Sequence, residues 1–232
     1  MGCLDARARG HALLHASGYG GACLTPDSPI VFVVDDDRRV RDALSRLIAS
    51  AGLAAVTFAS AAEFLEYEKP DAAACLVLDL QIPGMDGLEL QQQLAEGDAP
   101  PIIFITGHGD IPSTVRAMKA GAVEFLSKPF DDEELLRAIH IAIGRNRETR
   151  RKRSELSELR RRYALLTSRE REVLPFVVAG FANKEAAADL GIAENTIAVH
   201  RGQIMRKMGS RSLAELVRMA DKLGISSVHP KG

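Results

Sequence analysis

The sequence contains few cysteines and no long apolar run near its start. Cys3, Cys23 and Cys75 are too few and too widely spaced for a disulfide framework or a zinc site. Residues 1–27 mix Ala, Gly, Arg and two His without a sustained apolar stretch, which excludes a signal peptide and a membrane span there. We therefore expect a cytoplasmic protein without a membrane partner, and we expect residues 1–27 to form a disordered extension.

The chain carries almost no net charge, but its two halves differ strongly. Its 232 residues exceed one typical domain, so two domains are expected. Residues 28–143 contain 9 Lys and Arg against 19 Asp and Glu, whereas residues 144–232 contain 19 against 10. An acidic half suits metal binding and a basic half suits nucleic-acid binding.

A lone aspartate, Asp79, ends an apolar, strand-like run that begins at Cys75. A turn containing Pro83 and Gly84 follows it. In an open α/β sheet, ligands and chemistry gather outside the carboxyl ends of the strands. Asp79 is thus a candidate nucleophile or metal ligand, and its alternative role is to cap a turn.

Three consecutive acids, Asp35, Asp36 and Asp37, follow a second apolar run over residues 30–34. Carboxylates this close repel one another unless a cation neutralises them, and Mg²⁺ prefers such oxygen ligands. Asp37 precedes a helical segment and suits the N-cap position. That assignment leaves Asp35 and Asp36 for the ion.

Two further strand ends carry polar side chains. Thr106 ends the run over residues 101–106, and Lys128 follows residues 123–127 directly before Pro129. Each feature alone is common: a threonine at a strand end usually has no function, and a lone lysine is normally a solvated surface charge. Their importance comes from the carboxyl-terminal sheet edge that they would share with Asp79.

The four strand ends together, in this order, resemble the receiver domain of bacterial two-component response regulators, over residues 28–144. The resemblance implies an α/β fold with a doubly wound, five-stranded parallel sheet. It implies that Asp79 accepts a phosphoryl group from a sensor histidine kinase. Mg²⁺ would be bound directly by Asp36, mainly through water by Asp35, and also by Asp79 and the backbone carbonyl of Gln81.

The same resemblance assigns roles to three other residues. Thr106 would donate a hydrogen bond to the phosphoryl oxygen, and Lys128 would pair with its charge. Phe125 matches the aromatic position whose packing differs between the inactive and active states. The peptide bond between Lys128 and Pro129 is expected to be cis, which costs an X-Pro bond only about 0.5–1 kcal/mol.

A basic segment over residues 145–162 contains good helix formers and neither Pro nor Gly. We expect it to be a helical linker that extends the last helix of the receiver domain. Its arginines either remain solvated or contact DNA directly.

The remaining residues, 163–232, have a helix-turn-helix pattern. Thr167 and Glu170 form a capping-box sequence, and Pro175 predicts a bend in the helix that they start. A short Ala-rich helix over 183–190, a turn at Gly191 and a longer helix over 193–208 then predict a small all-α domain whose second helix enters the major groove. Ile197, Ile204 and Met208 recur at helical spacing and are expected in its core.

From Leu166 to about Ile225 these residues resemble the LuxR-type DNA-binding domain, through the run Leu166 to Leu174, Gly180, Asn183 to Glu185 and Thr196 to Arg201. A receiver followed by this domain is the NarL/FixJ arrangement, and residues 201–208 are closest to the FixJ side. The resemblance implies that bases are read by Ala198, Val199 and Gly202. It implies phosphate contacts by Lys184, Thr196, His200 and Arg201, although His200 could equally be a packed core residue.

Two residues depart from the LuxR-type pattern. Ala182 stands where a capping Ser or Thr is usual, which leaves Asn183 as the candidate cap. Ala198 stands where a polar base reader is frequent, so methyl contacts with thymine gain weight.

The combined resemblance implies a phosphorylation-controlled transcription factor, most simply an activator, rather than an enzyme beyond its own phosphorylation. Its expected partners are a histidine kinase, promoter DNA, RNA polymerase and a second copy of the chain. Dimer contacts are expected from residues 113–120, 123–126 and 133–143, with a further set from 213–223. Before phosphorylation, the receiver either covers the DNA-binding helices or leaves them monomeric.

Two alternatives remain open at this point. A haloacid-dehalogenase-like phosphatase would use an aspartate among residues 35–37 as its nucleophile, but it leaves Asp79 and the basic half unexplained. In the second alternative, a DNA-binding regulator uses its receiver only as an unphosphorylated interaction module.

Overall fold

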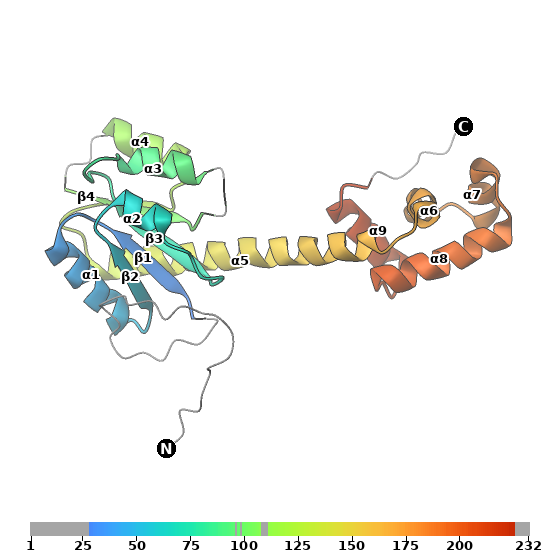
Figure 1. Ribbon diagram of the computed structural model, residues 1–232, viewed down its shortest axis with the longest axis horizontal. Helices are drawn as coiled ribbons and strands as arrows, with labels where there is room; N and C mark the ends of the chain where they lie inside the picture. The colour runs from blue at the N-terminus through green and yellow to red at the C-terminus, as the bar shows by residue number, and fades with distance from the viewer. Residues whose placement is uncertain (1–27, 96, 98, 108–110, 226–232) are drawn as a thin grey trace, which may run out of the picture. The chain divides into compact units, whose positions relative to one another are not determined.

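The computed structural model describes residues 28–95, 97, 99–107 and 111–225 (Figure 1). The predicted extension over residues 1–27 lies outside the described residues. The described part of the chain divides into two compact units, and the division falls between Glu148 and Thr149. This point lies inside the predicted 145–162 linker.

The first unit is built on a parallel sheet of five strands in the order β2-β1-β3-β4-β5. The strands are β1 (Ile30–Val34), β2 (Ala54–Phe58), β3 (Ala74–Asp79), β4 (Ile102–Thr106) and β5 (Glu124–Ser127). Every residue of β1, β3 and β4 is buried, as expected for strands covered on both faces. The predicted α/β doubly wound sheet is confirmed.

Helices cover both faces of this sheet (Figure 1). They are α1 (Arg38–Ser50), α2 (Ala61–Glu66), α3 (Gly87–Leu94), α4 (Ile111–Lys119) and α5 (Asp132–Ala164). One apolar core packs α1 and α5 against one face, and the other packs α2, α3 and α4 against the opposite face. Cys75 is buried in β3 as predicted, and burial raises the pKa of its thiol to about 12.

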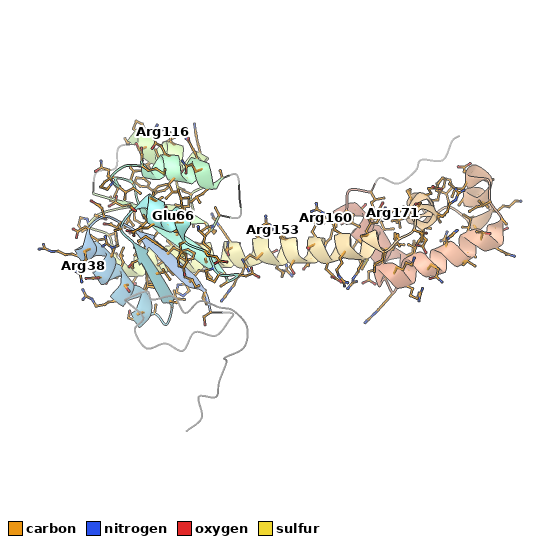
Figure 2. All side chains as sticks on the ribbon, viewed as in Figure 1. Arg38, Glu66, Arg116, Arg153, Arg160 and Arg171 are labelled. Atoms are coloured by element: carbon orange, nitrogen blue, oxygen red, sulfur yellow. The ribbon has the colours of Figure 1, made fainter. Side chains whose placement is uncertain are left out.

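The linker segment is helical throughout. Helix α5 runs for 33 residues without interruption, so it includes the predicted linker. Asn146 still contacts the sheet, because its Oδ1 accepts a hydrogen bond from the amide of Ala74 at 3.0 Å. Arg153 and Arg160 are exposed and lie on the part of α5 that follows Asn146 (Figure 2). Among the residues described, neither α5 nor any other helix combines the length and apolarity that crossing a bilayer requires.

The second unit contains four shorter helices packed around one core. They are α6 (Ser168–Val178), α7 (Asn183–Leu190), α8 (Glu194–Met208) and α9 (Leu213–Lys222). Ile197, Ile204 and Met208 are fully buried, which confirms their predicted core positions. Gly191 ends α7 in the left-handed conformation at φ 65°, so the predicted turn between the two helices is present.

The caps of the second unit agree in part with the sequence. Thr167 and Glu170 form the predicted capping box at the start of α6. Helix α6 continues through Pro175, and the bend there stays a prediction. Ala182 is the N-cap of α7 and Asn183 is its first residue, so Asn183 does not cap this helix. Glu185 partly replaces the missing cap, because its carboxylate accepts a hydrogen bond from the Ala182 amide at 2.9 Å.

Candidate functional site

Asp79 lies at the carboxyl end of β3, the central strand of the sheet. Its side chain is held at two points. One oxygen, Oδ1, accepts a hydrogen bond from the Gln81 amide at 3.0 Å, and the other, Oδ2, accepts one from Lys128 Nζ at 2.7 Å. The residue is 7% exposed, so the carboxylate is fixed in place while it stays in reach of solvent.

The three acids after β1 separate into different roles. Asp35 is fully buried and accepts hydrogen bonds from the Asp37 amide at 2.8 Å and from Lys128 Nζ at 2.7 Å. Asp36 is exposed. Asp37 caps α1 by accepting a hydrogen bond from the Arg39 amide at 2.8 Å, which confirms its predicted capping role.

Lys128 bridges two carboxylates from neighbouring strands. Burial tends to lower the pKa of this ammonium, but its hydrogen bonds to Asp35 and Asp79 outweigh burial and raise the pKa. For Asp35 the balance is opposite: burial raises the pKa of the carboxyl, although Lys128 works against it. Lys128 therefore remains charged, whereas burial makes ionisation of the Asp35 carboxyl less favourable.

The carboxylates form a cluster that fits a divalent cation. One oxygen each from Asp35, Asp36 and Asp79 lies within 4.8 Å of the others. Three carboxylates and one ammonium leave a formal charge of −2 at the cluster. A hard cation with oxygen ligands would neutralise this excess.

The remaining predicted receiver residues lie at or near the same sheet edge. Thr106 is the last residue of β4 and is fully buried, and its carbonyl accepts a hydrogen bond from the Lys128 amide at 2.7 Å. Gln81 follows Asp79 by two residues and is exposed. Phe125 is half-buried in β5, with its ring centroid 6.2 Å from that of Phe104. The peptide bond between Lys128 and Pro129 is cis, as expected.

The second unit presents one exposed face of α8. Thr196, Ala198 and Gly202 are exposed, and Val199 is 61% exposed although it is a large apolar residue. Lys184 is exposed on α7. Val199 therefore adds an apolar group to this exposed face of α8.

Two other residues predicted to contact DNA are half-buried rather than exposed. Arg201 donates a hydrogen bond from Nη1 to the Phe181 carbonyl at 2.9 Å, so part of its guanidinium joins α8 to the segment before α7. His200 is half-buried beside it.

Comparison with known proteins matches both units to families. A model of the response regulator receiver domain matches residues 31–140, and a model of the luxR family of bacterial regulatory proteins matches residues 164–220. Nodulation protein W of Bradyrhizobium diazoefficiens is 49% identical over 213 residues, which cover 91% of this chain and 94% of that protein. The chain is a NarL/FixJ-family response regulator.

Other relatives agree with this assignment. The response regulator is 46% identical to the transcriptional regulatory protein FixJ of Azorhizobium caulinodans, over 87% of this chain and 96% of that protein. It is 50% identical in sequence to the solved structure of the response regulator StyR, with a TM-score of 0.77, covering 84% of this chain and 99% of that chain. This is a family of transcription factors rather than catalytic enzymes, which decides against the phosphatase alternative.

Two contacts in the response regulator were not predicted from sequence. Arg41 donates from Nη1 to the backbone carbonyls of Asp35 at 2.6 Å and Asp36 at 2.9 Å, and so fixes the acidic loop. Lys207 Nζ contacts the buried Glu170 at 2.7 Å and thereby joins α8 to the start of α6. The only sequence signal for Arg41 is its place four residues after the Asp37 cap, and the sequence indicates only a capping role for Glu170.

Proposed function

We propose that this response regulator is a phosphorylation-dependent transcription factor, most simply an activator, in which Asp79 accepts a phosphoryl group from a sensor histidine kinase. One observation carries this proposal: Asp79 lies at the carboxyl end of the central strand with a charged Lys128 at 2.7 Å. Phosphoryl transfer needs mainly positioning and charge stabilisation from a protein. An oriented carboxylate beside a fixed cation supplies both.

Mg²⁺ is the proposed cofactor. Asp36, Asp79 and the backbone carbonyl of Gln81 would hold it directly, and Asp35 would act mainly through water. The formal charge of −2 at the carboxylate cluster supports this role. Mg²⁺ binds through few carboxylates, keeps several waters and neutralises charge on phosphate oxygens.

Thr106, Lys128 and Phe125 are the proposed switch residues. A phosphorylated side chain carries about −1.5 to −2 charges and three acceptor oxygens. Lys128 would move its ion pair to the phosphoryl group, and Thr106 would donate a hydrogen bond to it. The space that the Thr106 hydroxyl leaves would be filled by Phe125, which is only half-buried beside Phe104.

Phosphorylation is proposed to drive dimerisation through α4, β5 and the receiver part of α5. Three exposed apolar residues of α4 support this surface: Ile111 is 81% exposed, Val115 43% and Met118 42%. Their spacing of four and three residues places them on one side of the helix. Helix α9 is proposed as a second contact.

The dimer is proposed to bind promoter DNA through α8 and to recruit RNA polymerase in the cytoplasm. Ala198, Val199 and Gly202 would read bases in the major groove. Lys184, Thr196, His200 and Arg201 would contact phosphates, which position a protein without specifying sequence. The exposed Val199 supports base contact, since apolar groups recognise the thymine methyl.

Size-exclusion chromatography, which reports dimer formation, together with mass spectrometry, which reports phosphoryl uptake, tests the proposal. The wild type, Asp79→Asn and Asp86→Asn are each treated with Mg²⁺ and acetyl phosphate. Asp86 caps α3 in the neighbouring loop, and Asn caps as well as Asp, so Asp86→Asn controls for the lost charge. We expect a phosphoryl mass gain and dimer formation in the wild type and in Asp86→Asn only. Phosphate uptake by Asp79→Asn would refute the assignment, and no uptake by the wild type would favour the unphosphorylated interaction module.

A further inference from the structure

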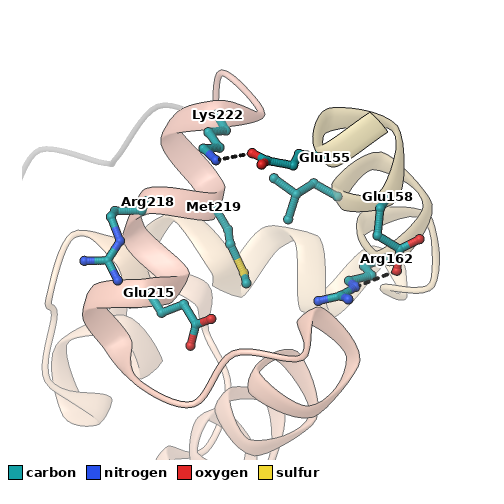
Figure 3. Close-up of a pocket in the computed structure, with 8 residues that line it drawn as sticks. Glu155, Glu158, Arg162, Glu215, Arg218, Met219 and Lys222 are labelled. Atoms are coloured by element: carbon teal, nitrogen blue, oxygen red, sulfur yellow. Dashed lines mark hydrogen bonds and ion pairs between the residues drawn. The ribbon is translucent and has the colours of Figure 1, made fainter. Parts of the chain in front are cut away.

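The last turns of α5 contact the C-terminal end of α8, the DNA-reading helix. Arg162 donates a hydrogen bond from Nη1 to the backbone carbonyl of Met208 at 3.1 Å. The same guanidinium donates from Nε to Glu158 Oε1 at 2.8 Å, and this ion pair is drawn in Figure 3. Glu158 therefore holds Arg162 in the orientation that reaches α8.

Met208 is a suitable acceptor because it is the last residue of α8. The last four carbonyls of a helix have no partner within the helix, and a cation there interacts favourably with the helix dipole. Arg206 and Lys207, the basic residues of this turn, contact Gln203 and Glu170 instead.

Gly209 leaves room for the Arg162 contact. It follows Met208 in the left-handed conformation at φ 69°. A β-carbon on Gly209 would lie 2.8 Å from Arg162 Nη1, so any larger residue would push the guanidinium aside. The backbone of α8 thus ends in a form that admits a side chain from α5.

The surroundings of Arg162 are a groove rather than a closed core. A space of about 370 Å³ lies between the end of α5 and α9 and is lined by Leu159 and Met219, with Lys222 and Glu155 paired at 3.0 Å across it (Figure 3). The side chains of Arg162 and Glu158 are 34% and 40% exposed. Ion pairs this exposed contribute little to stability. The Arg162 contact can therefore form and break without unfolding the unit.

We propose that Arg162 is a positioning residue that couples the linker helix to the DNA-reading helix, and that phosphorylation-dependent DNA binding requires it. This inference rests on the proposed function. Helix α5 begins four residues after Lys128 and is one uninterrupted helix as far as Ala164. A change in packing at its first turns is carried along the helix to Arg162. The hydrogen bond to Met208 then passes it to the end of α8.

The test compares DNA affinity with and without phosphorylation in the full-length chain. Wild type, Arg162→Gln, Arg162→Lys and the control Arg160→Gln are titrated against one duplex, selected from random sequences by the phosphorylated wild type. Arg160 is an exposed neighbour on the same helix, so Arg160→Gln removes the same charge (Figure 2). The readout is the ratio of affinities with and without acetyl phosphate, which a merely structural defect would not change.

We expect Arg162→Gln to reduce this ratio by roughly 5-fold, at the low end of allosteric couplings. Arg162→Lys, which keeps the charge but lacks the planar fork, is expected to recover part of it, and Arg160→Gln to keep the wild-type ratio. If folded Arg162→Gln keeps the wild-type ratio, the proposed coupling is wrong, while the proposed function is unaffected. Should Arg162→Gln fail to fold, a wild-type ratio in Arg162→Lys has the same meaning. Equal losses of affinity in both phosphorylation states also overturn it. If phosphorylation does not change the DNA affinity of the wild type, both the coupling and the proposed function are wrong.

Discussion

Glu170 has two structural tasks at once. Its carboxylate accepts hydrogen bonds from the Thr167 amide and from Lys207 Nζ, both at 2.7 Å, and its side chain is 5% exposed. Burial alone would raise the pKa of this carboxyl, but the contacts with Lys207 and Thr167 outweigh it and lower the pKa below 4.5. The cap of α6 and the position of α8 therefore depend on the same ionised group.

Glu170→Gln is expected to destabilise the second unit by about 1.5–3 kcal/mol at pH 7, the value of a hydrogen bond to a charged group. Because the folded pKa is depressed, this stabilisation is fully present above the unfolded value near 4.5 and is lost as the pH falls through the lower folded value. Hydrogen exchange of α6 and α8 amides measures the difference, which should shrink at acid pH.

The control for Glu170 lies two residues further on. Glu172 pairs with Arg169 at 2.7 Å, but its side chain is 48% exposed. Glu172→Gln is expected to cost about 0.2–1 kcal/mol at most, as for other surface pairs. Equal protection loss in both variants would show that burial of Glu170 has no energetic importance.

At the scale of elements, α4 carries the clearest unpaired apolar surface of the receiver. Ile111→Glu places a charge on this face, and we expect it to prevent phosphorylation-driven dimerisation while Asp79 still takes up the phosphoryl group. Leu65→Glu on α2, where Leu65 is 37% exposed, is the matched control. Sizing of both phosphorylated variants distinguishes them, and a dimer of Ile111→Glu would exclude α4 from the interface.

The same elements show which features sequence reasoning can reach. Local sequence pattern predicts the buried strands, the carboxylates at their ends and the cap at Asp37, because burial in a strand and turn formation depend on residues adjacent in the sequence. The contacts of Arg41 with the acidic loop and of Lys207 with Glu170 depend on how elements pack, and residue spacing does not encode them. Arg201 shows the same limit: the family resemblance implies a phosphate contact, and residue spacing does not indicate that its Nη1 also donates a hydrogen bond to the Phe181 carbonyl.

At the scale of the whole molecule, charge separates the two parts of the chain. The net charge is only −1, yet residues 28–143 carry an excess of acids and residues 144–232 an excess of bases. Attraction to DNA must therefore arise from local charge rather than from the overall balance. Residues on the basic side should determine how DNA affinity depends on salt, and residues on the acidic side should not.

Lys184→Gln, in the basic part, is expected to weaken binding to all duplexes alike and to reduce the slope of log affinity against log salt by about 0.9, the value for one phosphate contact. Arg46→Gln removes the same charge from an exposed position on α1 and should leave the slope unchanged. Val199→Ala should alter sequence preference without changing the slope, because apolar base contacts release no counterions. Fluorescence anisotropy across a salt series measures all three, and an unchanged slope in Lys184→Gln would remove this lysine from the DNA contact.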